Sequence, residues 1–264
     1  MILSQTIRRH SLSVLSVALA TTSFTGIALA SHSWGGYHWA RTNNPFTVDV
    51  GNNVTNAWTP YLSTTATDWS VSTVLDAKVV TGKSKGNCQP TLGRVEVCNA
   101  KYGNNGWLGI ASVWANGTHI TQGTVKMNDT YFATAKYNTS AWKNLVMCQE
   151  VGHTFGLDHQ DENFSNSNLG TCMDYTNDPT TNQHPNAHDY EELGIIYGHL
   201  DSTTTLIASK SQGAANQTNE DTTDPSKWGK VLKKDSHGRP SLHERDLGKG
   251  QKIFTFVLWA DETN

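Results

Sequence analysis

The chain has 264 residues, with 20 Lys and Arg against 23 Asp and Glu, which gives a formal net charge of −3. This near-neutral balance, without clusters of basic residues, argues against nucleic-acid binding. The length suits one sizeable core, or one domain with a small appendage. After the N-terminal segment, no stretch is long and apolar enough to span a bilayer.

The first residues have the pattern of a secretory signal peptide. Arg8 and Arg9 precede an apolar stretch from Leu12 to Ala20, and Ala28-Leu29-Ala30 forms a small-residue cleavage site. We therefore expect residues 1–30 to be removed, and the mature protein to be secreted, extracellular and free of the membrane. A membrane anchor is the alternative, but the apolar core is short for one.

Hydrophobic periodicity predicts a mixture of strands and helices after this segment. Apolar alternation and β-branched residues predict strands at Phe46–Val50, Val74–Val80, Arg94–Cys98, Trp107–Trp114 and Thr124–Asn128. A helix is predicted within Val54–Trp69, which Pro60 either starts or kinks. Thr139 or Ser140 can cap a second helix, and a third covers Asp189–Tyr197.

The second helix ends in an informative motif. Residues 149–159 read Q-E-V-G-H-T-F-G-L-D-H, which is the pattern H-E-x-x-H-x-x-G-x-x-H with its first histidine replaced by glutamine. On a helix, Gln149 and His153 lie one turn apart and can face the same metal ion. Glu150 is then placed to accept a proton beside that ion. Gly156 can adopt the positive φ that ends the helix, so that His159 returns to the ion.

This segment resembles the metzincin clan of zinc endopeptidases, and V-G-H-T-F-G-L-D-H is most similar to its matrixin-like members. Metzincins carry a methionine in a tight turn beneath the metal, and Met173 in T-C-M-D-Y stands in that place. Tyr175 resembles the tyrosine that astacin-type and serralysin-type members place near the zinc. The metal ligands that the resemblance implies are Gln149, His153 and His159; the catalytic residues are Glu150 and Tyr175.

The same resemblance implies an α+β fold, in which a twisted mixed sheet is backed by two helices. A small lower subdomain would contain the Met173 turn and a C-terminal helix. In such families one edge strand of the sheet pairs with extended substrate, and Trp107–Trp114 resembles that strand; an ordinary core strand is the alternative. Matrixins usually also have a pro-segment whose cysteine blocks the zinc, and we expect no such latch here.

The glutamine leaves three outcomes open. An amide oxygen is a poorer zinc ligand than imidazole, and even changes in the residues that support the ligands cost about 10 to 100-fold in affinity. Gln149 can coordinate weakly with help from Tyr175, or His184 or His188 can replace it as the ligand. In the third outcome no ion is held and the domain is a binding module. Cys148 is a further rival ligand, although it lies about 100° around the helix from the glutamine.

Four cysteines in an oxidising compartment predict two disulfides, with three possible connectivities. The pairs we expect are Cys88–Cys98 and Cys148–Cys172. Cys148 directly precedes the zinc motif and Cys172 directly precedes the turn methionine. The second bond would therefore tie the metal-binding helix to the methionine turn.

The sequence divides into four expected segments, which are a signal peptide at 1–30, a metzincin-like catalytic domain at 31–200, a polar linker at 201–226 and a short C-terminal β-like appendage at 227–264. The linker is rich in Ser, Thr, Asn, Gln and Gly and has no periodicity. The appendage is strand-like at Ile253–Trp259 but too short to form a core alone. We therefore expect it to pack on the catalytic domain as a hairpin.

These observations favour a secreted zinc-dependent endopeptidase, a monomer that acts on protein or peptide substrates. A catalytically inactive secreted binding module of the same fold is the alternative. A purely structural surface protein leaves the spacing of Glu150, His153 and His159 unexplained. Zinc is the expected cofactor, and the acidic stretch Asp158–Glu162 makes calcium a second candidate.

Overall fold

The computed structural model describes residues 31–84, 87–206 and 221–261, which belong to one unit spanning Ser31–Asn264. The expected signal peptide lies outside the described residues. None of the helices in the described part of the chain combines the length and the apolar character needed to cross a membrane.

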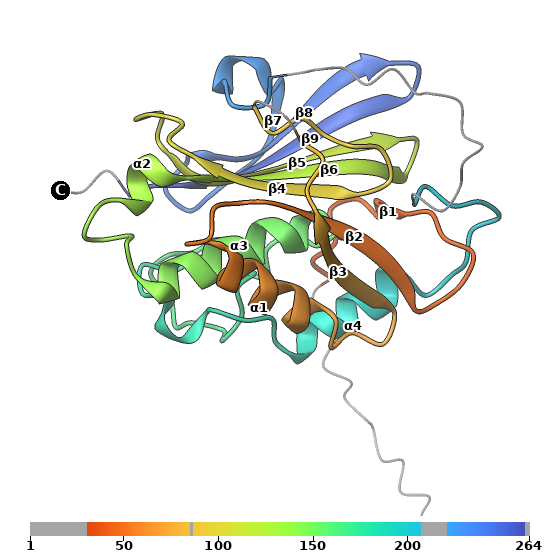
Figure 1. Ribbon diagram of the computed structural model, residues 1–264, viewed down its shortest axis with the longest axis horizontal. Coiled ribbons are helices and arrows are strands. Elements are labelled where there is room, and N and C mark those ends of the chain that lie inside the picture. Colours follow the sequence, from red (N-terminus) through yellow and green to blue (C-terminus); the bar gives the residue numbers. More distant parts are fainter. Residues whose placement is uncertain (1–30, 85–86, 207–220, 262–264) are drawn as a thin grey trace, which may run out of the picture. The chain divides into compact units, whose positions relative to one another are not determined.

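A nine-stranded mixed sheet forms one layer of this unit (Figure 1). Its strands are β1 His38–Trp39, β2 Phe46–Asn53, β3 Leu75–Thr81, β4 Val95–Ala100, β5 Trp107–Asn116, β6 His119–Asn128, β7 Lys230–Lys234, β8 Pro240–Gly248 and β9 Gln251–Trp259. They are ordered β3-β2-β4-β6-β5-β9-β8-β7, and β1 pairs with β6 off this path. The pairings among β1, β2, β3, β4 and β6 are parallel, whereas β5, β9, β8 and β7 are each antiparallel to their neighbours.

The helices are α1 Thr59–Trp69, α2 Asp129–Phe132, α3 Ser140–His153 and α4 Ala187–Ile196, with short 3-10 helices η1 Pro179–Thr181 and η2 Pro225–Lys227. Figure 1 shows α1 and α3 side by side beneath the sheet, with α4 on the same side. Pro60 lies in the first turn of α1, where its missing N–H costs no helical hydrogen bond, so the proline starts this helix. The expected α+β class, with a mixed sheet backed by two helices, is confirmed.

The strand β5 lies at the centre of the packing, and nine of its ten residues are buried. Leu108 and Val113 belong to the main core shared with α3, whereas Trp107 and Ile110 pack with Trp228 in a second cluster. Both faces of the strand are therefore covered, which explains its nearly continuous apolar sequence.

A glycine sets the close approach of α3 to this strand. A Cβ atom on Gly109 of β5 would lie 2.6 Å from Val146 Cγ1 and 2.9 Å from Glu150 Oε1. Only glycine fits this approach, so the sequence of β5 allows the end of α3 to lie directly against the sheet.

The three C-terminal strands continue the same sheet. The strand β9 pairs with β5 along its length, from Trp107 opposite Trp259 to Asn116 opposite Gln251. The segment forms a hairpin of β8 and β9, and β7 adds a third antiparallel strand. The edge of β5 that we expected to receive substrate therefore has β9 as its neighbour.

Candidate metal centre

The helix α3 places the first part of the motif. The Thr139 side chain accepts a hydrogen bond from the Trp142 backbone N–H, which fixes the start of the helix. Gln149 and His153 then lie one turn apart at its end. Gly156 has φ of 102°, and a Cβ atom there would lie 2.6 Å from the Tyr37 carbonyl oxygen. The chain turns at this glycine and brings His159 back to the helix.

The two histidines of the motif face each other, with their Nε2 atoms 3.0 Å apart. The Nδ1 atom of His153 bonds to the Leu157 carbonyl oxygen at 2.8 Å, and that of His159 bonds to Glu162 Oε1 at 2.9 Å. Because both partners accept, each Nδ1 carries a hydrogen, and the two Nε2 atoms face each other. Two imidazole ligands of a tetrahedral zinc ion lie about 3.3 Å apart. The pair is therefore arranged as two ligands of one cation.

Gln149 and Glu150, on the same helix as His153, carry unpaired polar atoms. Both side chains are buried, and among the described residues Gln149 Oε1, Gln149 Nε2 and Glu150 Oε2 have no hydrogen-bond partner. A buried polar group without a hydrogen-bond partner lowers the free energy of unfolding by about 1–3 kcal/mol. An amide oxygen and two imidazole nitrogens are donors that can bind a divalent cation such as zinc, and the carboxyl group of Glu150 adds a group that can accept a proton.

The protonation states suit metal binding. Burial, followed by the charge of His159, lowers the pKa of His153 well below its usual value, so this ring is in the neutral form that coordinates metals. Burial raises the pKa of Glu150 well above its usual value, against the opposing effect of a hydrogen bond with the Ala111 backbone. Glu150 is thus adapted to hold and release a proton.

Carboxylates behind His159 fix its orientation. Glu162 accepts from His159 Nδ1, and Asp158 Oδ1 accepts from the His159 backbone N–H at 2.9 Å. Lys233 on β7 pairs with the other oxygen of Asp158. Such carboxylate–histidine contacts are usual behind metal ligands and raise their basicity. The acidic stretch that suggested calcium therefore has His159 and Lys233 as partners, and calcium stays a prediction.

The methionine turn lies directly under α3. A Cβ atom on Gly152 would lie 2.8 Å from Met173 Sδ and 2.6 Å from the Trp69 ring. Cys148 and Cys172 form a disulfide between the helix and the turn, which excludes Cys148 as a metal ligand. The other expected disulfide, Cys88–Cys98, is also formed.

Two residues of β9 cover this site. The Phe256 ring stacks on His153, with centroids 4.0 Å apart and planes 10° apart. The Tyr175 hydroxyl donates a hydrogen bond to the Val257 carbonyl oxygen at 3.2 Å, and the Tyr175 ring lies 4.2 Å from that of His159. Burial, followed by the charge of Glu162, raises the pKa of Tyr175 well above its usual value, so the hydroxyl remains a donor.

The two alternative histidine ligands lie in other surroundings. His184 Nδ1 is 2.7 Å from Asp68 Oδ2, and the His184 side chain is 55% exposed. The ring of His188 lies 4.7 Å from that of His32. Neither contact is with the glutamine or with the motif histidines, so the described arrangement does not support either residue as the replacement ligand.

Sequence reasoning missed Glu162, Phe256 and Val257. Glu162 could have been recognised by its position three residues after His159, because metal-bound histidines are often paired with a carboxylate. The strand character of β9 was visible, but its pairing with β5 was not, because periodicity identifies a strand without identifying its neighbour.

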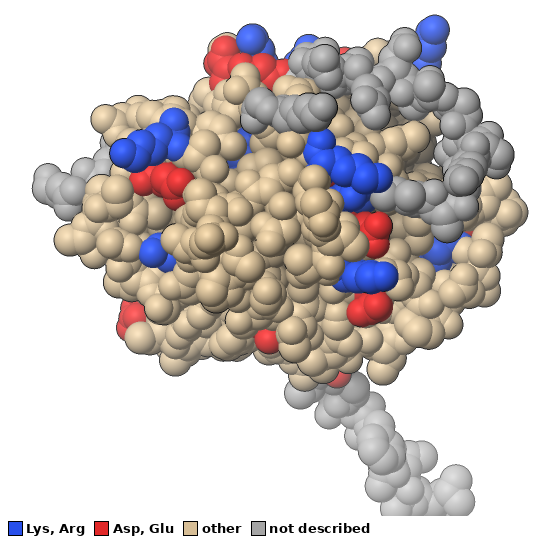
Figure 2. Space-filling model, viewed as in Figure 1, with Lys and Arg blue, Asp and Glu red and all other residues tan. Residues whose placement is uncertain are grey.

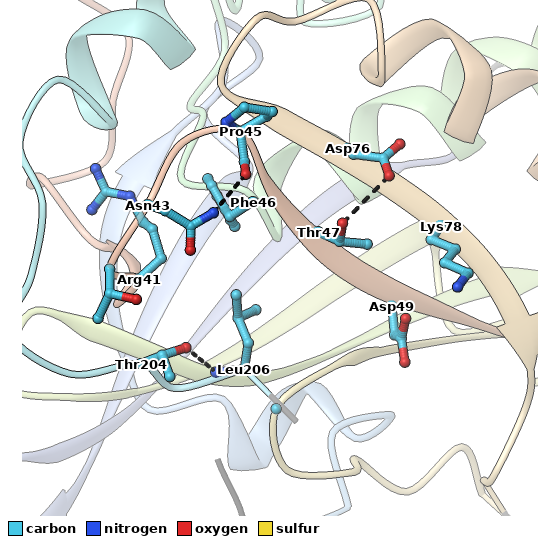
Figure 3. Close-up of a pocket in the computed structure, with 12 residues that line it drawn as sticks. Arg41, Asn43, Pro45, Phe46, Thr47, Asp49, Asp76, Lys78, Thr204 and Leu206 are labelled. Carbon is cyan, nitrogen blue, oxygen red and sulfur yellow. Dashed lines mark hydrogen bonds between the residues drawn. The ribbon is translucent and has the colours of Figure 1, made fainter. Parts of the chain in front are cut away.

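A pocket of about 870 Å³ lies away from this centre. Its lining comes mainly from β2 and β3 and from the residues that flank β2 (Figure 3). There Thr47 and Asp76 are joined by a hydrogen bond, and Leu206 lies on the opposite side.

Figure 2 shows that Lys and Arg lie beside Asp and Glu on the described part of one face, with broad uncharged areas between them. That face offers mixed charge rather than a field of one sign.

Comparison with solved structures finds a similarity to the structure of myroilysin, with a TM-score of 0.36 and 13% sequence identity. The similarity covers 61% of this chain and 96% of that chain. No protein-family model matches the chain, and no curated protein matches it. A similarity this distant carries no functional inference, so the chemistry rests on the residues described above.

Proposed function

We propose that this protein is a zinc-dependent endopeptidase whose substrate-binding edge is occupied by its own C-terminal strand. The observation that carries the proposal is the 3.0 Å approach of the His153 and His159 Nε2 atoms, supported by the buried, unpaired polar atoms of Gln149 and Glu150 on the same helix as His153. Secretion of the mature chain is part of the proposal, which the two disulfides support.

Gln149, His153 and His159 would hold the ion. When bound, zinc supplies Lewis acidity that polarises a carbonyl group and makes water a stronger nucleophile. Glu150 would take the proton of that water at its free Oε2 atom and pass it to the leaving amine. Tyr175 would donate its hydroxyl hydrogen to the carbonyl oxygen of the scissile bond.

The strand β9 makes the contacts that an extended substrate would make. It runs antiparallel to β5 and supplies the Val257 carbonyl oxygen to the Tyr175 hydroxyl. Phe256 covers one flat face of the His153 ring. A substrate can therefore reach Glu150 only after β9 leaves β5, and the described state is the latent form of the proposed enzyme.

The proposal is tested by zinc analysis and by cleavage of a mixed peptide library. The recognition sequence of a site-specific protease, inserted between the exposed residues Lys249 and Gly250, allows β9 to be separated from the chain. We expect bound zinc in the intact protein and cleavage of peptides only after this cut. Glu150→Ala should abolish the cleavage and retain the zinc. Cleavage that is unaffected by Glu150→Ala would contradict the proposed mechanism.

An inactive binding module is the second candidate. The observations that favour it are the glutamine at the first ligand position and the burial of Gln149 and Glu150 beneath β9. In this case, zinc would be bound in stoichiometric amount, or not at all, and no peptide would be cleaved even after β9 is removed. The same pair of assays therefore separates the two candidates.

A further inference from the structure

We propose that the chain has a second metal site, in which His38, His119, His199 and Asp201 hold a structural zinc ion. The site uses none of the residues of the candidate metal centre described above, and it does not depend on the proposed function.

The fold brings these residues together from three distant segments. His38 on β1 is the register partner of His119, the first residue of β6. His199 and Asp201 follow α4, and the Asp201 backbone N–H donates to the Arg41 carbonyl oxygen at 2.9 Å. The segment after α4 is therefore fixed beside the paired strands.

The ligand atoms of His38, His119 and Asp201 all lie within 4.8 Å of one another, and His199 approaches two of these residues. Asp201 Oδ1 is 3.5 Å from His38 Nε2, 3.2 Å from His119 Nε2 and 3.8 Å from His199 Nε2. The Nε2 atoms of His38 and His199 are 3.2 Å apart. Ligands of a tetrahedral zinc ion with bonds of about 2.0–2.1 Å lie about 3.3 Å apart, so the spacing among His38, His119 and Asp201 suits one ion, with His199 as the fourth ligand.

The hydrogen bonds around the cluster orient lone pairs toward its centre. His38 Nδ1 donates to the Gly36 carbonyl oxygen at 2.8 Å, which leaves Nε2 to face the other ligands. Asp201 Oδ2 accepts two hydrogen bonds from Arg41, one from its backbone N–H at 3.1 Å and one from its guanidinium at 2.9 Å. Only Oδ1 faces the three histidines. These supporting contacts are of the kind that positions metal ligands.

Two of the four side chains are largely buried, and the other two are exposed. His38 and Asp201 are 6% and 11% exposed, whereas His119 and His199 are 36% and 56% exposed. The buried pair gives a fixed base for the site, and the exposed pair leaves a route by which an ion can enter. Imidazole and carboxylate groups both bind zinc, and four protein ligands without an open position are the mark of a structural rather than a catalytic site.

The ion would link the start of the sheet to the segment that leaves α4. This segment already bonds to the strand residues, because the Thr205 backbone N–H donates to the Ala40 carbonyl oxygen at 3.0 Å. A shared ion adds a connection between His119 and His199, which belong to elements with no sequence proximity. We therefore expect the ion to stabilise the fold rather than to take part in chemistry.

The test compares His199→Ala with His184→Ala in the full mature chain. Both histidines lie beside a carboxylate and are similarly exposed, at 56% and 55%, so the substitutions should disturb folding to a similar small extent. Each protein is stripped with a chelator and titrated with zinc chloride, and the bound zinc per chain is counted by atomic spectrometry. Cobalt(II), used separately, reports tetrahedral coordination through its visible absorption.

We expect His199→Ala to bind one zinc ion fewer per chain than both wild type and His184→Ala, and to lose the corresponding cobalt absorption. Zinc should also raise the melting temperature of His184→Ala more than that of His199→Ala. Equal zinc stoichiometry in the two variants would overturn the proposal, and the cluster would then be a hydrogen-bonded network only. His159→Ala removes the ion of the other centre, so failure of one site is distinguishable from failure of the other.

Discussion

Gln149 is the residue that we propose sets the metal affinity of the candidate centre. Its side-chain atoms are buried and unpaired among the described residues, one helical turn from His153. Gln149→His would replace an amide oxygen by an imidazole nitrogen, which is a stronger zinc ligand. We expect zinc affinity to rise by about 10 to 100-fold or more, measured by competition with a chromogenic chelator. An unchanged affinity would mean that residue 149 does not face the ion.

Glu150 is separable from metal binding. Because Glu150 would move a proton and not ligate the ion, Glu150→Gln should keep the zinc stoichiometry and lower kcat by about 10²–10⁴-fold in the form with β9 released. Parallel zinc analysis and peptide cleavage measure the two effects. Loss of zinc together with activity would instead assign Glu150 to the coordination of the ion.

At the scale of elements, β9 controls access to the centre. It covers β5 from end to end, and Phe256 and Val257 contact His153 and Tyr175. Cutting the exposed β8–β9 turn at Lys249 should release this strand and raise the rate of peptide cleavage, with a rate that increases on dilution as the strand dissociates. The matched control is the same insertion between His237 and Gly238, in the β7–β8 turn, where cutting leaves β8 and β9 joined. Equal activation by both cuts would contradict the role given to β9.

Elements with local signals could be predicted from the sequence. The motif helix was expected because a capping residue, apolar spacing and a terminating glycine all agree, and α3 indeed ends before Gly156. The strand β6 begins at His119 rather than at Thr124 because it pairs with β5 through a tight turn. The strand β8 was not predicted, since its H-E-R-D sequence lacks apolar alternation and its strand conformation comes from pairing with β9.

Long-range contacts could not be predicted. The placement of His153 and His159 in one sequence motif made the approach of their rings foreseeable, and the place of Gln149 in the site stays a prediction. The cluster of His38, His119 and Asp201 was missed because its members come from three segments that only the folded sheet brings together. The pairing of β9 with β5 was missed for the same physical reason.

For the molecule as a whole, a buried lysine links stability to pH. Lys126 on β6 donates to Thr222 Oγ1 at 3.0 Å, and burial lowers its pKa to about 8, against the opposing charge of Asp221. In the unfolded chain the same group titrates near 10.5. Between these values the unfolded state binds more protons, so the free energy of unfolding should rise with pH.

Lys126→Met removes this titration. Relative to that variant, the wild type should gain up to about 3 kcal/mol in the free energy of unfolding between pH 8 and 10.5, measured by denaturant titration. The comparison with the variant cancels the other groups that titrate in this range. Parallel pH profiles for the two proteins would show that Lys126 is not shielded from water in the folded state.

The central claim is that His153 and His159 share one ion with Gln149 and Glu150 beside it. Anomalous diffraction at the zinc absorption edge, from crystals of the full mature chain grown with zinc, locates such an ion directly. The account predicts an anomalous peak within about 2.1 Å of both histidine Nε2 atoms. Full occupancy of other sites with no peak between His153 and His159 would contradict it.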